Sequence, residues 1–286
     1  MLILDSDTVA DNLSLPLALP CTGLLRLSGV DAEAFAQSQF ANDVLALAPG
    51  QWQWNCWLSA KGRVLAVFAL LRQAPGELLL VLPDGGALAL GQSLARFVFR
   101  RKLTLAVDDA PVGGLMAAPV RACGATAAIG EDGVIELDWG STATPRTLRI
   151  GAPVGDGDQM LWRQADLIAG LPRLDASQHD SWTAQQLGLD RLAAYSVRKG
   201  CYPGQEIVAR THFLGKAKRA TTLLSGIGHD ALPGQDVACD GHRIGQLACV
   251  AAPYALAVMP LETPAGPLQV NGVEVQAIAL EDGLQR

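Results

Sequence analysis

One cysteine lies in a segment whose neighbours could give it chemistry. Cys201 follows the cationic pair Arg198 and Lys199 and precedes a Pro203-Gly204 dipeptide. Two fixed positive charges favour the thiolate, which is the form of cysteine that acts as a nucleophile or a metal ligand. A free cysteine is more often a small buried apolar residue, but flanking charges and a turn favour an accessible position. A reactive thiol and a packing thiol therefore both remain open.

The turn after Cys201 has a strong signal of its own. Proline presets φ at the second position of a type II turn, and glycine accepts the positive φ of the third position. The next residues, Ile207-Val208-Ala209, are apolar and two of them are β-branched, which is typical of a buried strand. We therefore predict that the turn leads into a strand.

Basic residues gather around this segment although the chain as a whole is acidic. The formal net charge is −6, whereas residues 198–219 hold six basic side chains against one glutamate. Charge that clusters against the net charge marks where an anion would be drawn. A solvated surface is one alternative, and nucleic acid is another, which the acidic character of the chain disfavours.

The composition bounds the class of protein. Half of the residues are hydrophobic and 17% are charged, as in a globular protein rather than a disordered one. We expect no secretory signal and no membrane span, because no basic N-terminal region and no uninterrupted apolar run of 18 residues is present. The six cysteines are scattered, without a C-x-x-C pair or a histidine at ligand spacing. We therefore expect free thiols, no metal site and a cytoplasmic location.

The hydrophobic pattern predicts mixed helix and strand. Strands are expected at 23–29, 52–58, 63–71, 77–82, 102–107, 134–139 and 147–150, and helices after Asp31, at 84–99 and at 160–169. This order indicates an α+β protein rather than a doubly wound sheet. From residue 215 onward, six short strands separated by turns predict a small closed barrel.

The segment Lys199-Gly200-Cys201-Tyr202-Pro203-Gly204-Gln205-Glu206 resembles the K-G-C-[FY]-x-G-Q-E signature of the YgfZ family. That family consists of folate-binding relatives of the aminomethyltransferase, or T-protein, of glycine cleavage. Residues 35–44 resemble its F-x-Q-x-Q-x-x-x-D-V segment, and residues 160–172 its helix ending in A-G-x-P. The resemblance implies a three-lobed aminomethyltransferase-like α+β fold. Its folate-binding region is expected at 1–214, as two lobes (1–50 with 155–214, and 51–154), and its barrel at 215–286.

The resemblance also implies a tetrahydrofolate site in a cavity between lobes. Trp162 holds the place of a tryptophan that contacts folate in the family, and a second tryptophan of some relatives falls near Thr22. Cys201 and Lys199 are the implied chemical residues. The residues implied to bind folate are Trp162, Arg210, Gln205, Glu206, Tyr202, Lys61 and Asp43.

Two functions of different classes follow from the resemblance. The first is a folate-binding accessory protein that maintains or repairs iron–sulfur enzymes, including tRNA-thiolating ones. Its partners would be those enzymes or cluster-assembly proteins, and Cys201 would bind a transient cluster or form a mixed disulfide. The second is a tetrahydrofolate-dependent aminomethyl or one-carbon transferase. The T-protein uses an aspartate in a G-G-x-x-D-D stretch, but Leu65 and Ala66 stand here where the acids would fall. With no other carboxylate expected to replace them, we favour the first function.

Overall fold

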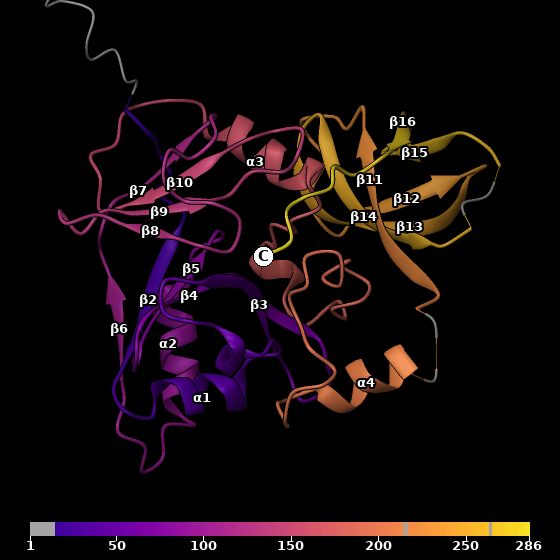
Figure 1. Ribbon diagram of the computed structural model, residues 1–286. Helices are drawn as coiled ribbons and strands as arrows, with labels where there is room; N and C mark the ends of the chain where they lie inside the picture. Colours follow the sequence, from indigo (N-terminus) through magenta and orange to yellow (C-terminus); the bar gives the residue numbers. More distant parts are fainter. Residues whose placement is uncertain (1–14, 214, 216, 263–264) are drawn as a thin grey trace, which may run out of the picture.

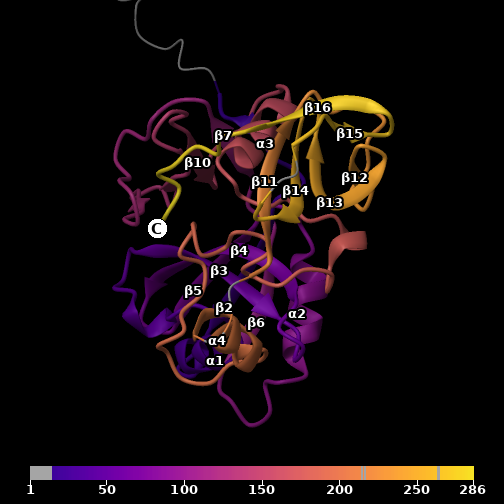
Figure 2. The ribbon, with the colours of Figure 1, turned by 90° about the vertical axis from the view of Figure 1, so that its right-hand side faces the viewer.

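The computed structural model describes residues 15–213, 215, 217–262 and 265–286. A five-stranded sheet carries helices on one face, a second five-stranded sheet packs on its other face, and a closed barrel forms the third lobe (Figure 1). Figure 2 shows the barrel above the first sheet in the turned view. The predicted three-lobed α+β fold with a C-terminal barrel is confirmed. None of the described helices has both the length and the apolar character needed to cross a bilayer.

Alternating apolar residues build the first sheet, which has the antiparallel order β3-β4-β5-β2-β6. Its strands are β2 (Gly23–Ser28), β3 (Trp52–Leu58), β4 (Val64–Ala74), β5 (Glu77–Leu82) and β6 (Thr104–Asp108). Successive side chains of a strand point to opposite faces. Leu25 and Leu27 therefore pack with the helices α1 (Ala32–Gln39) and α2 (Ala87–Ala95), whereas Leu24 packs on the other side.

The second sheet has the order β1-β7-β10-β9-β8. Its strands are β1 (Leu17–Ala18), β7 (Val112–Leu115), β8 (Ala128–Ile129), β9 (Ile135–Asp138) and β10 (Thr147–Ile150). The two sheets do not follow the expected division at residue 50, because β2 pairs with both β5 and β6. Residues 17–18 and 112–150 supply the strands of the second sheet instead.

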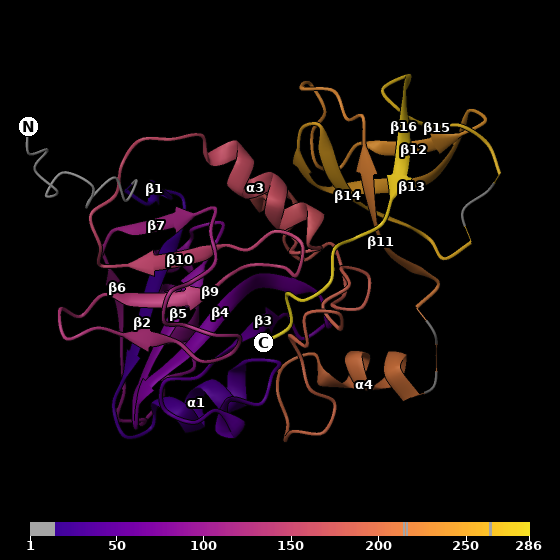
Figure 3. The ribbon, with the colours of Figure 1, turned by 45° about the horizontal axis from the view of Figure 1, so that its top comes forward.

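The barrel closes in the order β11-β14-β13-β12-β15-β16. Its strands are β11 (Arg219–Ser225), β12 (Asp236–Cys239), β13 (His242–Ala251), β14 (Tyr254–Pro260), β15 (Leu268–Val270) and β16 (Val273–Ile278). The two-residue turns Asp240-Gly241 and Asn271-Gly272 join neighbouring strands with positive φ at both positions, as type I′ hairpins require. Helix α3 (Gln159–Ile168) lies between the second sheet and the barrel (Figure 3).

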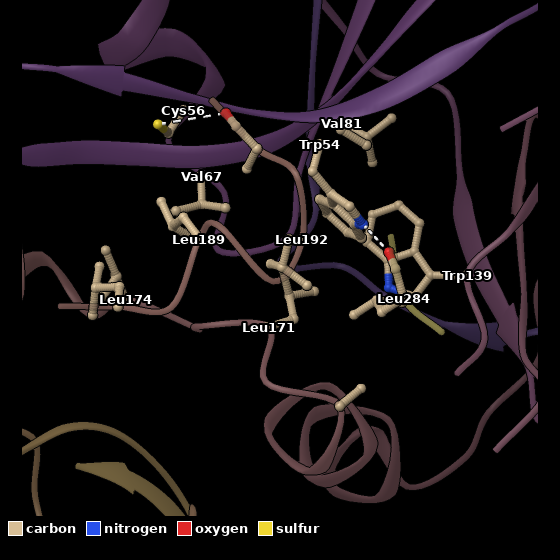
Figure 4. Packing of buried hydrophobic residues seen from close by; sticks show 14 of the residues in the cluster. Trp54, Cys56, Val67, Val81, Trp139, Leu171, Leu174, Leu189, Leu192 and Leu284 are labelled. Atoms are coloured by element: carbon tan, nitrogen blue, oxygen red, sulfur yellow. Dashed lines mark hydrogen bonds between the residues drawn. The ribbon is translucent and has the colours of Figure 1, made fainter. Parts of the chain in front are cut away.

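The largest core joins all three lobes. Trp54 of β3 and Trp139 meet edge to face, with ring centroids 4.7 Å apart, and Leu171 and Leu192 lie beside them (Figure 4). The Trp54 indole N–H donates to the Leu284 carbonyl oxygen at 2.7 Å. The segment that leaves the barrel therefore returns to the core between the two sheets.

The predicted strand after Cys201 is wrong. Residues Gln205–Phe213 form helix α4, at the level of α1 and away from the barrel (Figures 1 and 2). Ile207 packs against Gly62, Val208 is buried, and Arg210 is exposed. The packing of Ile207 and Val208 stabilises the helix by more than the weak strand preference of these two β-branched residues opposes it. The 3₁₀ turns η1 (Val44–Ala46) and η2 (Ala176–Gln178) complete the regular structure.

Candidate functional site: an interlobe cavity and the signature loop

A cavity of about 760 Å³ opens between the first sheet, α2 and the chain that follows α3. Its apolar wall includes Trp57 of β3, Leu65 and Ala66 of β4, and Leu90 of α2. The volume and the largely apolar lining are those of a small-molecule site. Leu65 and Ala66, which stand where the resemblance places the acids of the T-protein, therefore line this cavity with apolar side chains.

The polar groups of the cavity gather around Arg173, which is buried. Its Nε donates to Asp84 Oδ1 at 2.7 Å, its Nη1 to Asp166 Oδ2 at 2.6 Å, and its Nη2 to the Pro83 carbonyl oxygen at 2.5 Å. Burial opposes the charge, but the two carboxylates outweigh it and raise the pKa of the guanidinium. Arg173 is therefore charged, and each of its three nitrogens donates a hydrogen bond.

The hydrogen-bond network of Arg173 continues into the protein through Asp166. This fully buried carboxylate also accepts from Arg146 Nη1 at 2.7 Å and from the Trp139 indole nitrogen at 3.2 Å. Two buried guanidinium groups thus share one buried carboxylate. A buried charge is tolerated only when it is paired and hydrogen-bonded in this way. The wall of the cavity at Arg173 is therefore held by a connected network of hydrogen bonds.

The expectation that no other carboxylate replaces Leu65 and Ala66 stays a prediction. Asp84, which the sequence analysis missed, is a carboxylate of the same cavity. It follows β5 and precedes two glycines in the left-handed region, Gly85 (φ 73°) and Gly86 (φ 75°). Those glycines make the helix start later than predicted, at Ala87. Burial raises the pKa of the Asp84 carboxyl, with Arg173 acting in the opposite direction.

The strand register was a signal that could have located Asp84. Strands β4 and β5 are antiparallel, with Ala69 opposite Val81. Three residues further along each strand, the same register brings Ala66 and Asp84 to the same end of the sheet, and both line the cavity. The strands predicted at 63–71 and 77–82 follow each other closely in the sequence, which favours this antiparallel pairing.

A smaller cavity of about 200 Å³ adjoins the first and shares Cys21, Arg163 and Arg173 with it. Trp162 and Thr22 both line this smaller cavity, so the structure brings together the two positions that the resemblance singled out. Trp162 is only 3% exposed. The Arg146 guanidinium lies 4.7 Å from its ring centroid, and Gly114 lies against its six-membered ring. Little of the ring remains for a ligand, and Trp57 is the more accessible aromatic wall.

The signature loop lies elsewhere. Cys201 is exposed, and neither cavity includes it. Lys199 is 7% exposed, and its Nζ donates to the carbonyl oxygens of Gln37 (2.6 Å), Phe40 (2.5 Å) and Asn42 (3.0 Å). Burial lowers the pKa of Lys199 to about 8, with Asp43 and Cys56 acting in the opposite direction. The ammonium group is thus held by three backbone carbonyl oxygens, which form the carbonyl cage of Lys199.

The other predicted folate-binding residues surround the loop and α4. The Tyr202 hydroxyl donates to the Ser196 carbonyl oxygen at 3.1 Å, and Gln205 Nε2 donates to the Lys199 carbonyl oxygen at 3.2 Å. Asp43 Oδ1 accepts from Gln37 Nε2 at 2.9 Å. The remaining three, Lys61, Glu206 and Arg210, are exposed. None of these six lines either cavity.

Two further cavity residues lacked a sequence signal. Trp57 belongs to the strand predicted at 52–58, and Arg163 to the helix predicted at 160–169. Arg163 lines both cavities and, among the described residues, makes no ion pair. It is therefore the cation of the cavities that is left to meet an anion or a carbonyl oxygen.

The fold places this chain in a defined class. It matches the crystal structure of glycine cleavage system aminomethyltransferase T from Bartonella henselae with a TM-score of 0.72, over 96% of this chain and 88% of that one, at 16% identity. The protein therefore has the aminomethyltransferase T fold.

The sequence comparison narrows the class. The chain is 28% identical to proteins named tRNA-modifying protein YgfZ from Vibrio vulnificus and Colwellia psychrerythraea, over 71% of this chain and 68% and 69% of theirs. It is 29% identical to an uncharacterized protein of Haemophilus influenzae over 69% of this chain and 68% of that one. No family model matches the chain. The chain is therefore similar in sequence to proteins named tRNA-modifying protein YgfZ and shares its fold with aminomethyltransferase T.

Proposed function

We propose that this protein binds tetrahydrofolate in the 760 Å³ cavity and supports iron–sulfur enzymes, including tRNA-thiolating ones, through the loop that carries Cys201. The cavity is the observation that carries the proposal, because it combines an apolar wall with a fixed polar end. The fold shared with aminomethyltransferase T and the relatives named tRNA-modifying protein YgfZ give it support.

The residues of the cavity fit a folate. A pterin is a flat ring with adjacent N–H donors and a carbonyl oxygen, and the polar end offers the Asp84 carboxylate and the Arg163 guanidinium. The aminobenzoyl ring would contact the apolar side chains Trp57, Leu65 and Leu90. Bound tetrahydrofolate would supply the reduced N5 and N10 atoms that carry one-carbon units.

The transferase alternative is less well supported. Leu65 and Ala66 offer no acid or base where the T-protein has its carboxylates. Asp84 is a carboxylate of the same cavity, but one of its oxygens accepts from Arg173 at 2.7 Å. This hydrogen bond fixes one of the two carboxylate oxygens in place, so Asp84 has only the other for a substrate. Binding without aminomethyl transfer is the function that this wall favours.

The thiol acts at a second place on the molecule. Cys201 is exposed on the loop between Lys199 and α4, so its sulfur is open to a partner protein. A thiolate is a soft ligand that suits iron–sulfur clusters. Because this thiol lies outside the cavity, folate binding and support of iron–sulfur enzymes should be separable by substitution.

Separate variants test the two halves. Tryptophan fluorescence is followed during titration with tetrahydrofolate, for the wild type with its six tryptophans and for Ala66→Trp, whose added indole ring takes up part of the cavity. In cells that lack the protein, the activity of an iron–sulfur enzyme is measured with the wild type, Cys201→Ser or Cys123→Ser. Cys123 is the matched exposed thiol.

We expect Ala66→Trp to lose folate binding, and Cys201→Ser to bind folate but fail in cells, while Cys123→Ser works. A wild type that shows no saturable response to tetrahydrofolate would refute the folate site. A working Cys201→Ser variant would refute the role of the thiol.

A further inference from the structure

We propose that Asp84, held in place by Arg173, is the residue of the cavity that accepts hydrogen bonds from the adjacent N–H donors of a 2-amino-4-oxo heterocycle such as a pterin. The inference rests on the proposed tetrahydrofolate site and names the residue that would orient the ligand within it.

The geometry of Asp84 leaves one oxygen for a ligand. Its Oδ1 accepts from Arg173 Nε at 2.7 Å. Within the described ranges, Oδ2 takes part in no hydrogen bond, and the side chain is 23% exposed while it lines the cavity. One oxygen is therefore fixed by the protein, and the other has no partner among the described residues, on a side chain that lines the cavity.

Arg173 acts as a positioning residue rather than as a ligand contact. Its three nitrogens donate to Asp84, Asp166 and the Pro83 carbonyl oxygen. The Pro83 contact also ties Arg173 to the turn that carries Asp84. Arg173 thus holds both the Asp84 carboxylate and the backbone carbonyl of the preceding residue, Pro83. This lowers the entropy that is lost when a ligand binds.

Two structural roles could otherwise account for Asp84. It precedes α2 by three residues, and an acid near a helix N-terminus is favourable. However, its only hydrogen bond in the described part of the chain is to Arg173, and α2 has no side-chain cap. It also helps to neutralise Arg173, because Asp166 is shared between Arg173 and Arg146. That pairing uses Oδ1 alone, so neither role accounts for Oδ2, which has no partner among the described residues on a side chain that lines the cavity.

The chemistry of the ligand follows from the acceptor. An ionised carboxylate accepts hydrogen bonds and donates none, so Asp84 selects for N–H or O–H donors. In a pterin, the 2-amino group and N3–H lie side by side, and the adjacent carbonyl oxygen needs a donor. Arg163 lines the same cavity and supplies such a donor. This pairing turns the pterin head toward Asp84 and leaves the aminobenzoyl ring for the apolar wall.

The experiment compares two ligands with three proteins. Binding of tetrahydrofolate and of a 2-desamino tetrahydrofolate analogue is measured by calorimetry for the wild type, Asp84→Asn and Asp109→Asn. Asp109 is the matched control, because it is an exposed carboxylate that lines neither cavity. Thermal unfolding of each variant is recorded alongside. If Asp84→Asn does not fold, Asp84→Glu, which keeps the charge beside Arg173, replaces it.

We expect Asp84→Asn to weaken tetrahydrofolate binding about 10- to 100-fold, the loss typical of a hydrogen bond to a charged group. The analogue should bind the wild type weakly and should lose little further affinity in Asp84→Asn. Asp109→Asn should stay within about twofold of the wild type, and Asp84→Glu should show an intermediate loss for tetrahydrofolate. Equal tetrahydrofolate affinity in the wild type and Asp84→Asn, or in the wild type and Asp84→Glu where Asp84→Asn does not fold, overturns the inference and leaves the proposed site standing. A wild type that does not bind tetrahydrofolate overturns the proposed site and the inference with it.

Discussion

The Lys199 ammonium group lies 2.5 Å from the Phe40 carbonyl oxygen, at the end of helix α1. The signature loop is thus fastened to the first lobe by a lysine that points inward, while Cys201, two residues later, is exposed. The contact makes Lys199 an anchor of the loop, whereas its charge had been expected to favour the Cys201 thiolate.

Replacing Lys199 should loosen this anchor. Lys199→Met leaves the carbonyl oxygens of Gln37, Phe40 and Asn42 without their donor, which should cost about 1–3 kcal/mol of unfolding free energy. Chemical denaturation of both proteins at pH 7 measures the loss. Lys218→Met, at an exposed lysine, is the control and should change stability by less than about 0.5 kcal/mol. Equal losses in the two variants would contradict the anchor.

The same lysine predicts a pH dependence. Its folded-state pKa is about 8, below the value of 10.5 for an unburied lysine. Between these two values the folded protein has released the proton while the unfolded chain keeps it, so the unfolded state binds more protons and stability rises with pH. Below pH 8 both states are protonated and this contribution is flat. The rise from pH 8 to 10.5 should be absent in Lys199→Met. If NMR shows that Lys199 titrates near pH 10.5, the carbonyl oxygens stabilise the charged form and the predicted pH dependence is contradicted.

Thiol reactivity gives a direct comparison within one molecule. Cys201, Cys21 and Cys123 are exposed, whereas Cys56, Cys239 and Cys249 are buried. Burial raises the pKa of the Cys56 thiol to about 12, so this cysteine should stay unmodified in the folded protein. Mass spectrometry after brief alkylation near neutral pH should find Cys201 modified first. Faster modification of Cys21 or Cys123 would count against a special role for the signature loop.

The shared carboxylate behind the cavity should be essential for stability. Asp166→Asn leaves the buried Arg146 and Arg173 without the charge that both contact, and removing one partner of a buried ion pair costs about 3–5 kcal/mol. Thermal and denaturant unfolding measure it. Asp282→Asn removes the partner of the exposed pair with Arg191 and should be nearly neutral. A loss below about 1 kcal/mol in Asp166→Asn would mean that water satisfies this network.

Trp162 tests the aromatic position that the resemblance assigned to folate. Because the ring is buried between Arg146 and Gly114, Trp162→Ala should destabilise the fold by about 3–5 kcal/mol, as core tryptophans do. The folded fraction should bind tetrahydrofolate with nearly the wild-type affinity, because little of the ring is exposed to a ligand and Trp162 does not line the larger cavity. Trp57→Ala, at the larger cavity, is the comparison and should weaken binding. Weaker binding in Trp162→Ala than in Trp57→Ala would place the ligand against Trp162.

Local patterns were sufficient for much of the fold. The strand at 77–82 and the barrel hairpins followed from alternation and from the Asp240-Gly241 and Asn271-Gly272 turns, because those signals act over a few residues. Helix α4 could not be predicted in this way, since its conformation depends on the packing of Ile207 against Gly62, far away in the sequence. Long-range contacts also decide the site. Lys199 next to Cys201 predicts an activated thiol, but only the folded chain shows that its ammonium group meets the carbonyls of 37–42.

The central claim is that the cavity beside Asp84 and Arg173 binds tetrahydrofolate. Calorimetric titration of tetrahydrofolate into the wild type, Ala66→Trp and Arg210→Ala tests it most directly. Ala66 lines the cavity, and Arg210 is exposed on α4 among the residues around the signature loop. The account predicts saturable binding to the wild type, a loss of at least about tenfold in Ala66→Trp because the new ring occupies the ligand's volume, and a smaller change in Arg210→Ala. Unchanged binding in Ala66→Trp together with lost binding in Arg210→Ala would contradict it and place the folate at α4.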